Sequence, residues 1–207
     1  RIFCHGFILN KGEKVSKSLG NTSDPFQLVK DYGADQLRYF LMRETPFGND
    51  GNYSHELITN RVNADLANDL GNLAQRILTM VWRNCDSKIP KATQLRDNDK
   101  LLLESIPNLY EKLGDLMKNY QISIYISSIF EVISLTNKYI SNEKPWELNI
   151  NNQPRMYTVL WVACEMLRNI TILLQPILVS SSSDLLDALG ISEKKRSFKN
   201  LGDKDLL

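Results

Sequence analysis

The fold is decided by residues 54–84, which read SHELITNRVNADLANDLGNLAQRILTMVWRN. Apolar residues recur through this stretch at Leu57, Val62, Leu66, Leu70, Leu73, Ile77 and Met80. This spacing gathers them on one face of an α-helix, so we expect a long amphipathic helix that ends near Asn84. Gly71 lies inside it at a cost of roughly 1 kcal/mol relative to alanine. A glycine there indicates either close helix packing or room for a ligand against the backbone.

The chain beyond this helix keeps the helical period. We predict further helices over residues 98–119, 120–141, 154–174 and 177–189, after a connector at 88–93. The isoleucines of 120–141 could suit a strand, but their helical spacing extends over a length that no strand reaches. Pro107 should kink its helix, Pro145-Trp146 should open a short turn, and Gln175-Pro176 should break the fourth helix.

The first fifty residues follow another pattern. Residues 2–9 read as a buried strand and 10–13 as a tight turn. Asp24 should cap a helix that begins at Pro25, with Gln27 closing a capping box and Gly33 ending the helix. Two short helices within 24–43 should lead into a Pro/Gly-rich loop through 52. We therefore predict a mainly α protein, in which a broken α/β end joins an antiparallel helical bundle.

Composition sets limits on the function. The chain has 207 residues, 43% of them hydrophobic, and a formal net charge of +1. This argues against a polybasic binder, although one local patch could still meet RNA. Cys4, Cys85 and Cys164 are far apart, so neither a zinc site nor a disulfide framework is expected. We expect reduced thiols in a cytoplasmic protein, with no signal peptide and no apolar run long enough to span a membrane.

A small cationic loop follows the predicted turn, with the sequence Lys14-Val15-Ser16-Lys17-Ser18-Leu19-Gly20-Asn21. Lysine ammoniums supply point charges for phosphates, while serine hydroxyls and backbone N–H groups supply directed donors. These residues therefore suit a polyphosphate. Taken alone, however, they fit an ordinary solvated hairpin better.

The segment Lys14–Ser18 resembles the KMSKS signature of the class I aminoacyl-tRNA synthetases, with the apolar Val15 in place of methionine. Further segments occur in the order typical of methionyl-tRNA synthetases, rather than of the leucine, isoleucine, valine or cysteine enzymes. These segments are Gly33–Phe40, Thr45–Gly51 and above all Arg61–Leu73. The resemblance runs over about the first 150 residues and then fades into a general helical pattern.

This resemblance implies a division of the chain. Residues 1–53 would be the end of a Rossmann catalytic domain, with the KMSKS-like loop and a region that contacts the tRNA stem. Residues 54–190 would form a helical anticodon-binding bundle. Residues 191–207 would be a polar tail, and the polar composition from Glu193 to Leu207 leads us to expect that this part is mobile.

The resemblance also assigns roles to the loop. Lys17 would approach the ATP phosphates as methionine attacks, where a cation stabilises the charge that builds on pyrophosphate. Lys14 would assist or hold the shape of the loop. Ser16 and Ser18 would donate to phosphates or act as local caps.

The bundle receives three candidate residues. Asn72 and Arg76 are four positions apart and share a helix face, and the resemblance implies that they contact the first anticodon base, a cytosine. Trp146 would stack on the same base. Stacking tolerates any base, so specificity would have to come from Asn72 and Arg76. Without the resemblance, helix packing would explain each of them better. We assign Trp82 and Trp161 to packing on apolar helix faces.

Parts of a complete synthetase are missing from the sequence. Its histidines, His5 and His55, do not form the HIGH motif of the class, and there is no Gly-rich nucleotide loop. The chain opens on Arg1 within a strand-like run, as a piece of a longer protein would. We expect a full protein that joins methionine to tRNA(Met) using ATP and Mg²⁺, and a chain that is inactive alone, with no metal site and no membrane or DNA partner.

Two alternatives remain. The chain could belong to another class I synthetase of the same architecture, although the presence of Asn72, Arg76 and Trp146 argues against this. It could also be a non-catalytic helical module that binds tRNA or another RNA. The intact loop from Lys14 to Ser18 argues against that alternative, because a pure binder has no use for a phosphate site.

Overall fold

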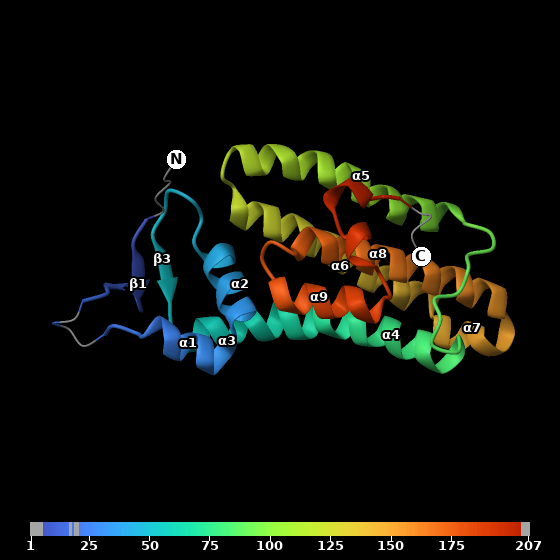
Figure 1. Ribbon diagram of the computed structural model, residues 1–207, viewed down its shortest axis with the longest axis horizontal. Coiled ribbons are helices and arrows are strands. Elements are labelled where there is room, and N and C mark those ends of the chain that lie inside the picture. The colour runs from blue at the N-terminus through green and yellow to red at the C-terminus, as the bar shows by residue number, and fades with distance from the viewer. Residues whose placement is uncertain (1–5, 17, 19–20, 204–207) are drawn as a thin grey trace.

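The computed structural model describes residues 6–16, 18 and 21–203. Figure 1 shows an elongated molecule with a small sheet and short helices at one end and long helices filling the rest. The order of elements is a short strand and helix segment followed by a helical bundle. This confirms the mainly α fold class predicted from the sequence.

The sheet has the strand order β2-β1-β3 within the described residues: β1 spans Ile8–Asn10, β2 spans Glu13–Lys14 and β3 spans Gly51–Tyr53. β1 and β2 form an antiparallel hairpin around the predicted tight turn. The buried strand predicted over residues 2–9 is wrong in its bounds and burial where the structure describes it: β1 begins at Ile8 and is half-buried, and Phe7 is 66% exposed. β3 runs parallel to β1, with Ile8 opposite Gly51. It lies in the segment predicted to be a loop, and only its pairing with a distant strand makes it extended.

Two short helices follow the loop: α1 spans Pro25–Tyr32 and α2 spans Ala34–Glu44. The Asp24 carboxylate accepts from the Phe26 N–H at 2.9 Å, which confirms the predicted N-cap. The expected capping box is wrong, because the Gln27 amide donates instead to Asp31 at 2.6 Å. Gly33 separates the helices with a φ of 91°, in the left-handed region that favours glycine.

The long helix predicted over 54–84 forms, but its middle is wider than an α-helix. It consists of α3 (His55–Arg61), a π-helical segment (Val62–Gly71) and α4 (Asn72–Asn84). A Cβ atom on Gly71 would lie 2.9 Å from the carbonyl oxygen of Leu66, five residues earlier. Gly71 is therefore explained by close approach within its own helix.

The bundle is completed by α5 (Asp97–Lys118), α6 (Ile122–Glu143), α7 (Pro145–Asn151), α8 (Gln153–Leu174) and α9 (Val179–Ala188). The structure confirms the isoleucine-rich α6 as a helix, and α5 continues through Pro107. α7 is a helix where a short turn was expected, with Pro145 at its first position.

The core of the bundle is α8. Almost every residue from 155 to 174 is buried, including Trp161, which is 8% exposed and confirms its assignment to packing. By length and composition alone α8 could cross a membrane, which corrects the expectation that no apolar run is long enough. However, 89% of its most apolar window is buried inside the bundle, as in the core helix of a folded domain.

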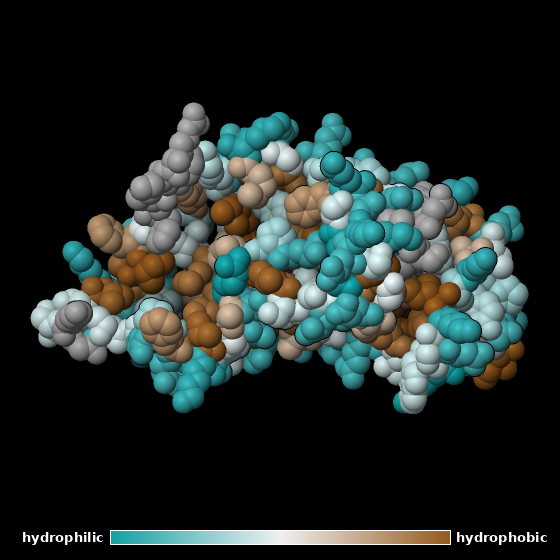
Figure 2. Space-filling model, viewed as in Figure 1, coloured by the Kyte–Doolittle hydropathy of each residue, from teal (hydrophilic) through white to brown (hydrophobic). Residues whose placement is uncertain are grey.

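Trp82 on α4 was also assigned to packing, and this is wrong. Its side chain is 65% exposed. The buried positions of α4 are Leu73, Ile77 and Val81, and Trp82 follows the last of these, pointing away from the core. Figure 2 shows that apolar side chains also reach the surface at the end of the molecule that carries the sheet.

The segment after α9 is docked on the bundle, which corrects the mobile tail expected from Glu193 for the described residues 193–203. Ile191 is 3% exposed. The buried guanidinium of Arg168 donates to the carbonyls of Asn200 at 3.0 Å and Asp203 at 2.9 Å, and the Gly202 N–H donates to Asn169 at 2.8 Å. The sequence could not predict these contacts, because the tail makes them with backbone groups and not with its polar side chains.

Two side chains of α2 fasten the sheet-bearing end to the bundle. The buried Asp35 carboxylate accepts from the N–H groups of Val179 at 3.0 Å and Ser181 at 2.7 Å, at the start of α9. Arg38 donates to the carbonyls of Pro176 at 2.7 Å and Ile177 at 3.2 Å. Together they bind the whole turn between α8 and α9.

We predict opposite effects of alanine at two helical glycines. Gly71→Ala should lower the free energy of unfolding by about 1–3 kcal/mol, because the Leu66 carbonyl is backbone and cannot move aside cheaply. Gly114→Ala in α5 is the matched control: nothing lies within 4 Å of its Cβ position, so it should stabilise by about 0.5–1 kcal/mol. Urea unfolding followed by circular dichroism measures both. A neutral Gly71→Ala would contradict the close approach.

Candidate nucleic-acid interface and phosphate-binding loop

The loop after β2 is held by Asn21. Its side-chain oxygen accepts from the Ser16 N–H at 2.8 Å, and its amide donates to the Lys14 carbonyl at 3.1 Å. The Asn21 carbonyl in turn accepts from the Asn10 side chain at 2.9 Å. The loop is thus closed at its base and fixed to β1.

The candidate loop residues are close together where the structure describes them. The Ser16 and Ser18 hydroxyl oxygens lie 2.7 Å apart, so two donors for one phosphate group are adjacent. The Lys14 ammonium lies over the Phe7 ring, 5.4 Å from its centroid, a cation–π contact that directs this side chain. Lys17 lies outside the described residues.

Asn21 is the residue to which the sequence reasoning gave no role. It stands at the end of the quoted loop, but nothing in its position distinguishes it from a turn asparagine. Its function in the structure comes from bonding both sides of the loop at once. The available signal was an asparagine at the end of a short cationic loop. Its side chain can both donate and accept hydrogen bonds, so it could have been expected to hold the loop.

The bundle brings two of its three candidates into contact. The Arg76 guanidinium carbon lies 5.6 Å from the ring centroid of Trp146, although the residues belong to α4 and α7. Trp146 is 46% exposed, so the pair is open to solvent. Asn72 is exposed at the start of α4, one turn before Arg76 on the same face.

The corner that carries Trp146 has a defined backbone. Lys144 ends α6 in the left-handed conformation, with a φ of 46°, and the next residue, Pro145, begins α7. Nearby, the Asn137 side chain donates to the Asp69 carbonyl of the π-helical segment at 3.2 Å. α6 is thereby joined to the long helix just before Asn72.

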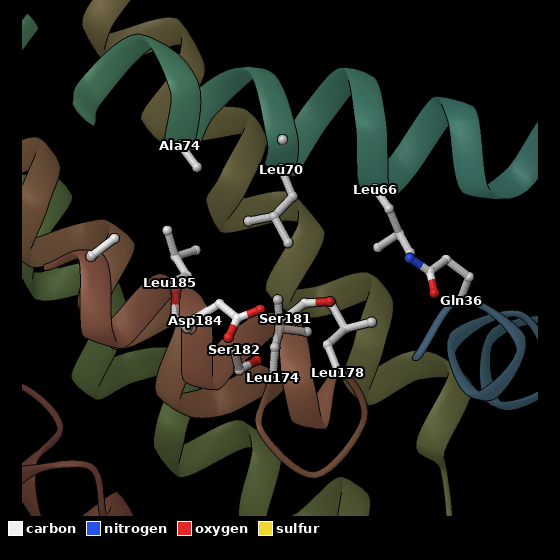
Figure 3. Close-up of a pocket in the computed structure, with 13 residues that line it drawn as sticks. Gln36, Leu66, Leu70, Ala74, Leu174, Leu178, Ser181, Ser182, Asp184 and Leu185 are labelled. Atoms are coloured by element: carbon white, nitrogen blue, oxygen red, sulfur yellow. The ribbon is translucent and has the colours of Figure 1, made fainter. Parts of the chain in front are cut away.

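A pocket of about 450 Å³ lies between the π-helical segment and α9. Figure 3 shows Leu66 and Leu70 pointing toward Leu178 and Leu185 across it. Gly71 lines the same space. Leucines and alanines line it together with a few polar side chains, among them Gln36 and Asp184.

The loop and the Arg76–Trp146 pair lie apart. In Figure 1, β1 and α7 stand at opposite ends of the long axis of the molecule. Among the residues described, no group of three or more His, Cys, Asp or Glu side chains is placed to hold a metal ion. The site geometry therefore consists of a polar loop with paired hydroxyls at one end and an exposed aromatic–cation pair on the bundle.

Comparison with known families gives one match for the N-terminal part of the chain and one for the helical bundle. Residues 1–78 match the family of tRNA synthetases class I (M), and residues 99–202 match the anticodon-binding domain of tRNA ligase. These two matches define the class as that of the class I tRNA synthetases.

The chain belongs, within that class, to the methionine–tRNA ligase family. The methionine–tRNA ligase of Brucella suis is 48% identical over 97% of this chain and 39% of its own length. That of Rhizobium meliloti is 45% identical over 98% of this chain and 39% of its own. Mycobacterium tuberculosis methionyl-tRNA synthetase, in a complex with methionyl-adenylate, superposes with a TM-score of 0.93 at 43% identity, covering 98% of this chain and 40% of that one. The chain thus spans about 40% of the length of these relatives.

We predict that Asn21→Ala opens the loop without unfolding the protein. The Ser16 amide loses its acceptor, so its hydrogen exchange should accelerate about tenfold, the effect of losing roughly 1.4 kcal/mol of protection. Exchange measured by NMR checks this, with the exposed neighbour Thr22→Ala as the control. An unchanged Ser16 exchange rate would show that Asn21 does not hold the loop.

Proposed function

We propose that this chain is the part of a methionine–tRNA ligase that reads the anticodon of tRNA(Met) and supplies the ATP-phosphate loop of methionine activation. The family match and the superposition with a methionyl-tRNA synthetase support the ligase class. The observation that carries the anticodon role is the contact between Arg76 and the exposed Trp146. The full protein would act in the cytoplasm, where Cys85 and Cys164, free in this structure, stay reduced.

The contact between Arg76 and Trp146 suits the recognition of a single-stranded base. In the free protein the guanidinium lies over the indole ring, and the Trp146 side chain remains 46% exposed. A cytosine stacking on Trp146 would contribute about 1–3 kcal/mol. Arg76 can then turn its N–H groups to the base edge, while the Asn72 amide both donates and accepts. Stacking provides affinity, and the two polar side chains provide the discrimination.

The loop suits the phosphates of ATP. Ser16 and Ser18 offer adjacent hydroxyls, and Lys17 would add the cation that stabilises pyrophosphate as it leaves. ATP would enter with Mg²⁺, and methionine would react with its α-phosphate in the remainder of the full protein. Lys14, directed toward Phe7, is better placed to hold the loop shape than to reach a phosphate.

The alternatives receive less support. Another class I synthetase would not account for the methionine-type match over residues 1–78. A non-catalytic RNA-binding module would not require the loop to be closed by Asn21 on three backbone or side-chain groups.

We predict that the purified chain binds tRNA with the anticodon CAU better than the same tRNA with the first cytosine replaced. The expected preference is at least about tenfold, since one well-recognised base contributes about 1–3 kcal/mol of discrimination. Both affinities must be measured at one salt concentration because phosphate contacts depend on salt.

Trp146→Ala should weaken binding of both tRNAs, and Asn72→Ala should reduce the preference more than the affinity. The exposed Trp82→Ala is the matched control and should leave the preference intact. Equal binding of the two tRNAs by the unaltered chain would overturn the anticodon role.

A second prediction concerns Lys17 in the full-length ligase. Lys17→Ala should lower the rate of methionine-dependent ATP–pyrophosphate exchange about 10²-fold or more, as expected for loss of one electrostatic transition-state contact. Its affinity for tRNA should stay nearly unchanged. A normal exchange rate would exclude this role of the lysine.

A further inference from the structure

A buried ionic cluster joins α5, α6 and α8 beside α7. At its centre is Arg155, whose side chain is 4% exposed. Its Nη1 and Nη2 atoms donate to the two Asp99 carboxylate oxygens at 2.5 and 2.8 Å, and its Nε donates to Glu143 at 3.0 Å. One planar group therefore holds a carboxylate on each of two other helices.

The Asp99 half of the cluster is the anchor. Burial alone would raise the pKa of Asp99, but hydrogen bonds from Arg155, the Arg96 N–H and Tyr139 outweigh burial and lower that pKa. Asp99 therefore stays ionised and fixes the guanidinium in one plane. The rigid fork of arginine then presents its remaining edge to Glu143.

Glu143 is connected to Trp146 by a stiff stretch of backbone. It is the last residue of α6, and the next residue, Lys144, takes the left-handed conformation. The buried Pro145 follows, and its ring fixes φ. Little free rotation remains between the backbone of Glu143 and that of Trp146, so fixing the former directs the latter.

α7 packs against α8 and its first residue, Pro145, is buried, but other side chains of α7 are open to solvent. Trp146 is 46% exposed and Ile150 88% exposed, while Leu148 packs partly buried against the core. The N–H of Arg155 donates to its own helix cap, Asn152, at 3.2 Å. The Arg155–Glu143 contact therefore closes the base of the chain segment 143–155, within which α7 lies.

We propose that Arg155 is a positioning residue for anticodon reading, which through Glu143 holds the Trp146 indole against Arg76. The inference rests on the proposed function of Trp146. Arg155 itself is buried and does not meet RNA. It acts by keeping the stacking surface in one orientation before the base arrives, so that binding does not have to order α7.

The test replaces Glu143, because removing Arg155 would leave Asp99 buried without a partner and threaten the fold. Glu143→Ala keeps the Arg155–Asp99 pair and cuts only the connection to the corner. Glu147→Ala is the matched control: it removes the exposed contact between Lys144 and Glu147, 3.2 Å long, at the same corner. Glu143→Gln, whose amide oxygen still accepts from Arg155, is the conservative rescue.

We expect Glu143→Ala to weaken binding of the CAU tRNA about fivefold, with the urea midpoint checked alongside. Glu147→Ala and Glu143→Gln should keep the affinity of the unaltered chain. Retention of the full affinity by Glu143→Ala would overturn the positioning role, because displacing the Trp146 indole must weaken stacking.

A second readout does not need RNA. The chain has three tryptophans, so labelling with 5-fluorotryptophan gives a small set of ¹⁹F NMR signals, and Trp146→Phe assigns one of them. Glu143→Ala should broaden or shift the Trp146 signal and leave that of Trp161 unchanged. An unmoved Trp146 signal would overturn the inference. If the signal moves while the unaltered chain shows no anticodon preference, the proposed function fails and the link between Arg155 and Trp146 stands.

Discussion

Because α8 is buried along nearly its whole length, each polar group that it carries must find its partner inside the protein. Arg155 near its start is satisfied by Asp99 of α5 and Glu143 of α6. Arg168 near its end is satisfied by Glu165 and by carbonyls of the segment after α9. An arginine without these partners would cost several kcal/mol. The positions of α5, α6 and the last described residues therefore follow from the requirements of one central helix.

The end that carries the sheet is connected to the bundle in several ways. One is the continuous helix from His55 to Asn84, with its π-helical segment in the middle. Another is the pair Asp35 and Arg38, which bind the turn between α8 and α9. A third is aromatic packing of Tyr39 on α2 against Phe130 on α6. These connections hold the end that carries the candidate loop in place relative to the bundle. The two candidate sites are thus far apart but share one mechanical frame.

Periodicity predicted the helices well, because burial on one face leaves a direct mark on the order of apolar residues. It could not predict β3, since three residues become a strand only by pairing with β1. It also failed for Trp82 and for the segment 193–203. An aromatic residue beside an apolar face resembles a core residue, and docking through carbonyl groups leaves no side-chain signal. At the candidate site, sequence spacing predicted that Asn72 and Arg76 share a face. The contact of Arg76 with Trp146 depends on how α4 and α7 pack, so local spacing could not reveal it.

The docking of residues 200–203 on Arg168 affects how the protein is made. Synthesis proceeds from the N-terminus, so these residues leave the ribosome after all of α8. Until they emerge, the Arg168 guanidinium lacks two of its acceptors and is better hydrated than buried. A nascent chain would accordingly keep one side of α8 uncovered, and this apolar side could associate with other unfinished chains. Because the core is closed by residues made after α8, the time during which a growing chain can aggregate is prolonged.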